Sequence, residues 1–154
     1  MMKKLTALVL VIVLSLSLSV TAFAADNRNT TITASINPTY TVTIPANTNV
    51  TFNTLSTSFG AVTLTAAQID PGYAVKVELN ASGTLKNQAD ATKTIAYTVN
   101  DANGDAFTVG TYTTAGDKTD LTIDITQAAW NAAFAGQYSD TVTFTVSYIN
   151  TVNP

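Results

Sequence analysis

Apolar and polar residues alternate along most of the chain after residue 29, and this pattern predicts β-strands. Successive side chains of a strand point to opposite faces, so a period of two indicates one buried face and one wetted face. Threonine fills many polar positions, where its branched Cβ favours extended backbone and its hydroxyl meets water. Strands are therefore expected at residues 30–36, 40–44, 49–52, 61–66, 73–79, 94–99, 120–125 and 140–148.

Turn-forming residues separate these predicted strands. Asp70-Pro71-Gly72 places proline and glycine where a type II turn requires them, and Asn103-Gly104 is a strong hairpin signal. Short strands divided by such turns are typical of antiparallel all-β domains. The sequence predicts an immunoglobulin-like antiparallel β-sandwich of about eight or nine strands, with a closed barrel as the alternative.

An alanine-rich segment with the single tryptophan interrupts this pattern near the C-terminus. Thr126 suits a helix N-cap and Gly136 suits a residue just beyond a helix end. Trp130, Ala133 and Phe134 are spaced to share one helix face. We expect a short crossover helix, in which Trp130, Phe134 and Gly136 have structural roles and Trp130 closes one end of the sandwich. The alternative is an exposed tryptophan that binds a sugar ring.

The start of the chain has the pattern of a secretory signal peptide. Lys3 and Lys4 precede the apolar run Leu5 to Val20, and Ala22-Phe23-Ala24 fits the small-residue cleavage site. We expect residues 1–24 to be removed, leaving residues 25–154 as a single domain that is secreted and extracellular or associated with the cell surface. A transmembrane anchor is the alternative, but the polar residues after Ala24 favour cleavage, so no membrane contact is expected afterwards.

Composition narrows the possible functions. The predicted signal peptide holds two of the seven basic residues, while the chain has ten acidic residues, so the remainder is acidic. An acidic, lysine-poor protein lacks the basic patches that bind nucleic acid. The chain has no cysteine and no histidine, which removes the usual catalytic triads and thiol chemistry. We therefore expect no enzymatic activity and no cofactor.

One segment resembles the start of a calcium-binding loop. Asp101, Asn103 and Asp105 repeat the spacing of the first three ligands of an EF-hand loop. However, the glycine comes one position early and the twelfth position is Tyr112, which is not acidic. A hairpin turn explains the same residues without a metal ion, so they are only a weak metal candidate.

The first predicted strand is separated from the second by a proline. Ile32, Ala34 and Ile36 alternate with polar residues, and Asn37-Pro38 interrupts the pattern before the next strand. Such a segment can pair with the edge of its own sandwich along residues 140–149, or with the same edge of a neighbouring copy. The sequence therefore predicts possible self-association by exchange of Ile32, Ala34 and Ile36.

The last predicted strand resembles the closing strand of small bacterial fimbrial subunits, in particular spore-coat-U-like pilin domains. The segment "AGQYSDTVTFTVSY" matches their pattern at Gly136, Tyr138 and Asp140, and "TITASINPTYTVTIP" is arranged similarly to their first strands. Those domains usually carry a cysteine pair, which this chain lacks. The chain also resembles small secreted β-sandwich surface proteins of clostridia.

Together with the signal peptide, the threonine-rich strands and the missing catalytic chemistry, these resemblances lead us to expect a non-enzymatic, secreted, surface-associated subunit. Its expected role is structural or adhesive, in a fibre, coat or matrix. Its partners are expected to be further copies of itself, or a glycan or protein on a host or other surface. The alternative function is a carbohydrate-binding module that acts as a soluble lectin.

Overall fold

The structure, a computed structural model, describes residues 31–152. The chain divides into two units, Met1–Ser35 and Ile36–Pro154. The predicted signal peptide, residues 1–24, lies outside the described residues, as do the first residues of the predicted domain, so both boundaries stay predictions.

Four strands form the first sheet of the Ile36–Pro154 unit, and every neighbouring pair is antiparallel. The strand order is β1 (Thr39–Thr43), β2 (Ser56–Gln68), β8 (Lys118–Asp124) and β6 (Thr98–Asp101). The long β2 and β8 are the central strands, and the inward residues Val62 and Leu64 of β2 are fully buried. The strands β1 and β6 are therefore the edges of this sheet.

A second antiparallel sheet has the order β10 (Thr143–Asn150), β3 (Tyr73–Asn80) and β7 (Val109–Tyr112). Its central strand β3 buries Val75 and Val77 in the same core cluster as Val62 and Leu64 of the first sheet. The two sheets thus enclose one core, as in a sandwich. Here β10 and β7 are the edge strands.

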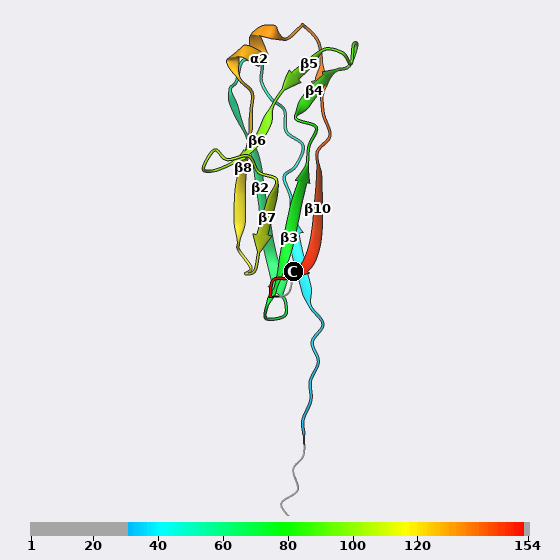
Figure 1. Cartoon of the computed structure of the whole chain (residues 1–154), viewed down its shortest axis with the longest axis vertical. Helices are drawn as coiled ribbons and strands as arrows, with labels where there is room; N and C mark the ends of the chain where they lie inside the picture. The colour runs from blue at the N-terminus through cyan, green and yellow to red at the C-terminus, as the bar shows by residue number, and fades with distance from the viewer. Residues whose placement is uncertain (1–30, 153–154) are drawn as a thin grey trace, which may run out of the picture. The chain divides into compact units, whose positions relative to one another are not determined.

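A small third sheet and the helix lie together at one end of the sandwich (Figure 1). The sheet has the order β5 (Thr94–Ala96), β4 (Thr84–Asn87) and β9 (Tyr138–Ser139). The helix α2 (Gln127–Ala132) starts at Thr126, whose side chain accepts a hydrogen bond from the Ala129 N–H. Because α2 follows β8 and precedes β9 and β10, it carries the chain from the first sheet to the others.

The predicted fold class is confirmed: the described residues form antiparallel β-structure with one short helix. An immunoglobulin-like strand order stays a prediction. The described residues hold ten strands rather than eight or nine. The predicted strand at 94–99 divides into β5 and β6, two predicted strands do not form, and the short β4, β7 (Val109–Tyr112) and β9 were not predicted.

Two of the predicted strands are wrong. Residues 31–36 form no strand in the described structure. Residues 49–52 lead into a turn, in which the Thr54 N–H donates to the Thr51 carbonyl at 3.1 Å and Asn53 has a φ of 68°. Alternation of apolar and polar residues shows only that a segment can form a strand with one buried face. The strand forms only where the edge of a neighbouring strand supplies hydrogen bonds.

Candidate functional site

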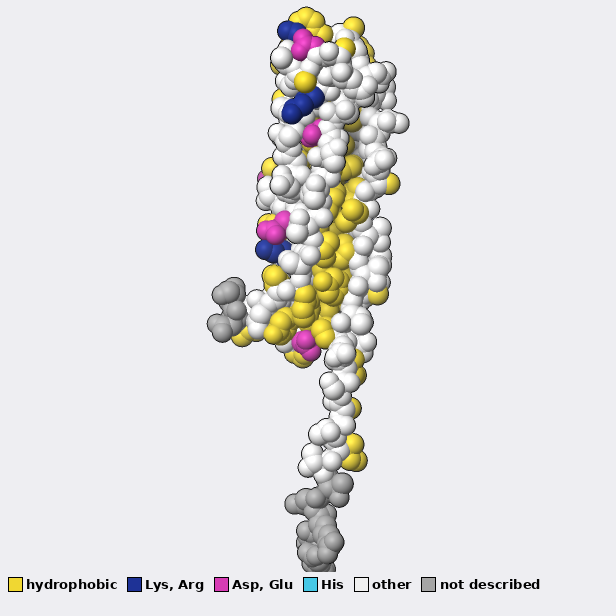
Figure 2. Space-filling model, turned by 90° about the vertical axis from the view of Figure 1, so that its right-hand side faces the viewer, with side chains coloured by type: hydrophobic (Ala, Val, Ile, Leu, Met, Phe, Trp, Pro, Cys, Tyr) yellow, Lys and Arg dark blue, Asp and Glu magenta, His cyan; other side chains and the backbone are white. Residues whose placement is uncertain are grey.

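The edge strands β1 and β10 face the same side of the sandwich and leave apolar side chains in contact with solvent. Tyr40 of β1 stacks on Tyr148 of β10, with ring centroids 5.8 Å apart, so the two edges lie side by side there. Their inward residues are Tyr40, Val42, Phe144, Val146 and Tyr148, and we call this surface the β1–β10 seam. Figure 2 shows apolar side chains running as a long stripe over the side of the molecule on which β10 lies.

Exposure separates the seam from the rest of the core. Val146 is 38% exposed and Tyr40 is 37% exposed, although both occupy inward positions of their strands. In contrast, Val62 and Val75 on the central strands have no exposed surface. Within residues 31–152, β1 pairs only with β2 and β10 pairs only with β3. The seam therefore combines exposed apolar surface with two strand edges that have no further strand beside them.

The opposite side of the sandwich, between β6 and β7, is closed by the segment that connects these strands. The Phe107 N–H donates to the Val99 carbonyl of the first sheet at 2.9 Å. One residue later, the Thr108 carbonyl accepts from the Leu79 N–H of the second sheet at 2.8 Å. The Phe107 side chain is only 7% exposed. Residues 107–108 thus bridge both sheets there, whereas no comparable bridge spans the β1–β10 seam in the described part of the chain.

Three tyrosines stack at the end of the seam where β10 finishes, and we call them the tyrosine stack. Tyr148 contacts Tyr73 with ring centroids 4.9 Å apart and Tyr40 at 5.8 Å, and the ring planes differ by 17° and 21°. The Tyr148 hydroxyl accepts from the Asp70 N–H at 2.8 Å and donates to the Asp70 carboxylate at 3.1 Å. Burial, together with the Asp70 carboxylate, raises the pKa of Tyr148.

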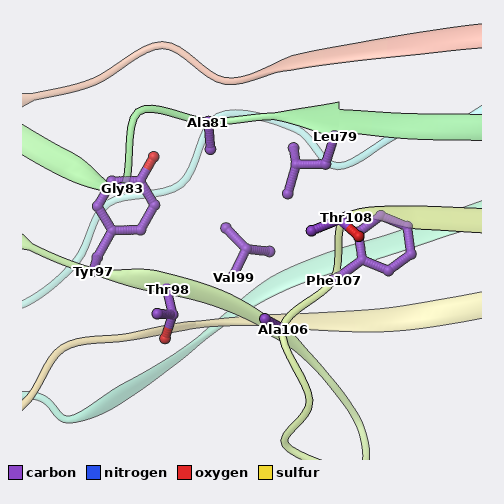
Figure 3. A pocket seen from close by; sticks show the side chains of 9 residues that line it. All are labelled: Leu79, Ala81, Gly83, Tyr97, Thr98, Val99, Ala106, Phe107 and Thr108. Carbon is purple, nitrogen blue, oxygen red and sulfur yellow. The ribbon is translucent and has the colours of Figure 1, made fainter.

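A hollow of about 190 Å³ lies beside the β6–β7 connection. Its lining is mostly apolar, and Figure 3 shows Val99 and Leu79 among the side chains around its centre. The nine residues that line it are Leu79, Ala81, Gly83, Tyr97, Thr98, Val99, Ala106, Phe107 and Thr108. Only Tyr97 and the two threonines among these residues have a polar side chain. The hollow therefore lacks the set of polar groups that usually orients a specific ligand.

The predicted structural residues of the C-terminal segment have different surroundings. Trp130 is 7% exposed, its indole N–H donates to the Thr54 carbonyl at 2.9 Å, and Phe52 packs edge-on against its ring. The predicted helix face shared by Trp130 and Phe134 is wrong, because α2 ends at Ala132 and Phe134 lies beyond it. Phe134 is 61% exposed, and the Lys93 ammonium lies 4.7 Å from its ring centroid. Gly136 does not end the helix, whose C-cap is Ala133, but lies against the side-chain amide of the buried Asn87. A buried indole has no free face on which a sugar could stack.

The weak metal candidate is a hydrogen-bonded turn. One carboxylate oxygen of Asp101 accepts from the backbone N–H groups of Asn103 and Asp105, at 2.8 and 3.1 Å. Within residues 31–152, no group of three or more acidic side chains is placed to hold a metal ion. Asp101, Asn103 and Asp105 thus stay only a weak metal candidate, and the hairpin turn remains the prediction for this segment.

The residues predicted for strand exchange are exposed. Ile32 is 93% exposed and Ile36 is 68% exposed, and Ala34 is also exposed. Isolated exposed apolar residues are common on proteins, but here two isoleucines alternate with polar residues. The same periodicity is present on β10, so this segment and the seam have matching patterns.

Sequence reasoning missed the tyrosine stack and the contacts of Asp140. Alternation places Tyr40, Tyr73 and Tyr148 on the apolar faces of their strands, but their mutual stacking depends on which strands lie together. Asp140 accepts hydrogen bonds from the hydroxyls of Tyr97 and Ser82, at 2.6 and 2.7 Å. No local signal in the sequence links these positions, because they are more than forty residues apart.

Comparison with models of known protein families and with curated proteins gives no match to this sequence. The resemblance to pilin domains and to clostridial surface proteins therefore stays a prediction. Among residues 31–152, no helix has the length and apolar character needed to cross a bilayer.

Proposed function

We propose that this protein is a non-enzymatic, secreted and surface-associated subunit, with a structural or adhesive role in a fibre, coat or matrix. The observation that carries the proposal is the β1–β10 seam, where two strand edges are open and the inward side chains of Tyr40 and Val146 are exposed. Exposed apolar surface of this kind commonly marks a site of protein association. An open edge is also a template for an added strand.

A second copy of the same chain is the partner that fits the seam best. Its segment 29–36 alternates apolar and polar residues, as a strand with one buried face must. Bound beside β10, this segment directs Ile32, Ala34 and Ile36 toward the exposed seam residues. Its residues Thr31, Thr33 and Ser35 then point toward solvent. The backbone groups at the outer edge of β10 then gain hydrogen-bond partners within the protein.

The place at which the chain enters β1 favours a second copy, rather than the chain's own segment 29–36, as the occupant of the seam. Thr39 pairs with Gln68 and Asn150 pairs with Tyr73, and only a short turn joins Gln68 to Tyr73. The start of β1 and the end of β10 therefore lie at the same end of the sandwich. To enter its own seam, the segment before Thr39 would have to reverse direction at once.

The residues available for that reversal are unsuited to it. A tight two-residue hairpin needs a positive φ at its first central residue and, in the commonest type, at both. Pro38 is locked at a negative φ, and the residue before a proline is held in the extended region. Asn37-Pro38 therefore opposes self-filling of the seam and favours exchange between copies.

The test measures self-association of the secreted protein over a range of concentrations, by analytical ultracentrifugation and negative-stain electron microscopy. We expect concentration-dependent oligomers that Val146→Asp weakens at least tenfold, because a carboxylate in the seam loses hydration when a strand covers it. Val109→Asp is the matched control, since Val109 is 50% exposed on the opposite edge strand β7. Equal loss in both variants contradicts the role of the seam.

The incoming segment has its own variant pair. Ile36→Asp should weaken assembly, whereas Thr33→Asp, on the other face of the segment, should leave it nearly unchanged. A protein that stays monomeric at all concentrations contradicts self-assembly. Tight binding of one glycan by that monomer, unaffected by the seam variants, would instead support the carbohydrate-binding alternative.

A further inference from the structure

The tyrosine stack is the part of this molecule best placed to react with an oxidant. Cysteine and histidine are absent from the chain, and its two methionines are Met1 and Met2. The single tryptophan, Trp130, is 7% exposed. The side chains that are oxidised most readily in proteins, cysteine and methionine, are thus missing from the sandwich, and tyrosine is the remaining target.

The six tyrosines differ in access and in surroundings. Tyr97 and Tyr112 are 7% and 3% exposed, so an oxidant in solution reaches them poorly. Tyr138 donates its hydroxyl to the Phe134 carbonyl and is in no tyrosine–tyrosine ring contact of the described structure. The other three form the tyrosine stack, in which Tyr40 is the most exposed ring.

Tyr148 is the ring common to both stacking contacts, and it alone has a carboxylate partner in the stack. Oxidation of a phenol by one electron also releases its proton. The Asp70 carboxylate, 3.1 Å from the Tyr148 hydroxyl oxygen, is placed to receive that proton. The Asp70 N–H donates a hydrogen bond to the same oxygen at 2.8 Å. This donor remains in place for the oxygen after the proton has left.

We propose that the tyrosine stack is a site of oxidative cross-linking, in which Tyr148 couples to Tyr40 or Tyr73 of the same chain to form dityrosine. The oxidant is hydrogen peroxide acting through a haem peroxidase. Each of two phenols loses one electron and one proton, and the two radicals join through ring carbons next to their hydroxyls. Both rings then regain aromaticity by moving a ring hydrogen to oxygen, while one peroxide molecule becomes two of water.

The two possible links have different consequences. Tyr73 and Tyr148 are on β3 and β10, which are already paired strands of one sheet. Tyr40 is on β1 of the other sheet, so a Tyr40–Tyr148 link joins the two edges of the seam covalently. This inference does not rest on the proposed function, because coupling within one chain needs no second copy.

The experiment treats the dilute secreted protein with a peroxidase and hydrogen peroxide. We expect dityrosine fluorescence in a species that still migrates as a monomer on denaturing gels and has lost two hydrogens in mass. Trypsin should then release residues 29–76 joined to residues 119–154, because these peptides hold Tyr40 with Tyr73 and Tyr148 with Tyr138. If residues 94–118 were linked instead, the coupled ring would be the buried Tyr97 or Tyr112 rather than a member of the tyrosine stack, which would contradict the proposal.

Variants assign the coupled rings. Tyr148→Phe keeps a stacked ring without the phenol and should reduce the monomeric dityrosine to background. Tyr40→Phe and Tyr73→Phe should each leave one coupling pair, and the double variant should leave none. Tyr138→Phe is the control and should couple as the wild type does. Circular dichroism of each variant checks that the fold is retained.

Three further outcomes would overturn the proposal. They are wild-type protein that forms no dityrosine, dityrosine found only in covalent dimers, and a Tyr148→Phe variant that couples as the wild type does. The Asp70→Asn variant tests whether the carboxylate, and not only the stacking of the rings, contributes to the rate of coupling. It removes the proton-accepting carboxylate but keeps the backbone N–H, so it should slow coupling without changing the peptides that are joined.

Discussion

The Tyr97 hydroxyl donates a 2.6 Å hydrogen bond to the Asp140 carboxylate, which joins the segment between β5 and β6 to the approach of β10. Ser82 donates to the same carboxylate oxygen at 2.7 Å. Desolvation acts to raise the pKa of Asp140, but these hydrogen bonds outweigh it and hold the pKa below the usual value of 3.8. The folded protein therefore stabilises the ionised form of Asp140 more than the unfolded chain does.

We expect this contact to make the protein sensitive to acid. A carboxyl group with a lowered pKa stabilises the fold at pH values above its unfolded pKa, and this stabilisation is lost as the pH falls through the folded pKa. The melting temperature should therefore fall below about pH 4. In Tyr97→Phe the acid-dependent part of the fall should shrink. An unchanged acid limb in that variant would show that other carboxylates dominate.

The same variant should act on the alkaline limb. Burial, with the hydrogen bond to Asp140 and its charge, raises the pKa of Tyr97 above the usual 10.0. A raised pKa means that stability is complete below the unfolded pKa and is lost as the pH rises above it. Melting curves recorded above about pH 10 should decline in the wild type and decline less steeply in Tyr97→Phe. A variant as alkali-sensitive as the wild type contradicts this assignment.

Trp130→Ala should destabilise the protein strongly. The indole is 7% exposed and hydrogen-bonded to the Thr54 carbonyl, so its removal leaves a cavity and an unpaired carbonyl. Replacement of a buried tryptophan by alanine typically lowers the free energy of unfolding by ~3–5 kcal/mol. Urea denaturation measures the change. A variant that unfolds like the wild type but loses a glycan ligand would instead support a sugar-binding role for Trp130.

Gly136→Ala should be more damaging than a glycine replacement in an open turn. Gly136 has a φ of 147°, and an added Cβ would collide with the side-chain amide of Asn87. Asn87 accepts from the N–H groups of Ala89 and Asp90, so its displacement would disturb that turn. We expect a loss of about 1–3 kcal/mol in the free energy of unfolding.

Gly104→Ala is the control for this change. Gly104 also has a positive φ, of 86°, but nothing lies within 4 Å of its added Cβ. It should therefore lose less stability in the same urea titration. Equal losses at both positions would mean that backbone strain alone matters and that the contact with Asn87 contributes little.

Calcium should leave the melting temperature unchanged. The Asp101 carboxylate is already engaged by two backbone N–H groups, and no further acidic side chain completes a ligand set within residues 31–152. Differential scanning fluorimetry with excess calcium, and with magnesium as the control ion, measures the effect. A rise that is specific to calcium and absent in Asp105→Ala would show that the turn binds the ion.

Local features of the fold were predictable because they depend on neighbouring residues. The alternation around Val75 and Val77 depends only on side chains two positions apart, so the strand and its buried face follow from the sequence. Likewise, Thr126 caps α2 because its side chain reaches an N–H three residues on. The strand predicted at residues 30–36 shows the limit of such reasoning, since alternation does not supply a partner edge.

The sequence by itself therefore determined that this protein is antiparallel β-structure, with one short capped helix ahead of its last strand. The tertiary structure alone decided which apolar faces stay open. Val146 and Val77 occupy the same kind of alternating position, yet one is 38% exposed and the other fully buried. The difference arises because β10 is an edge strand and β3 is central. Strand order depends on pairing between distant segments, which local periodicity does not encode.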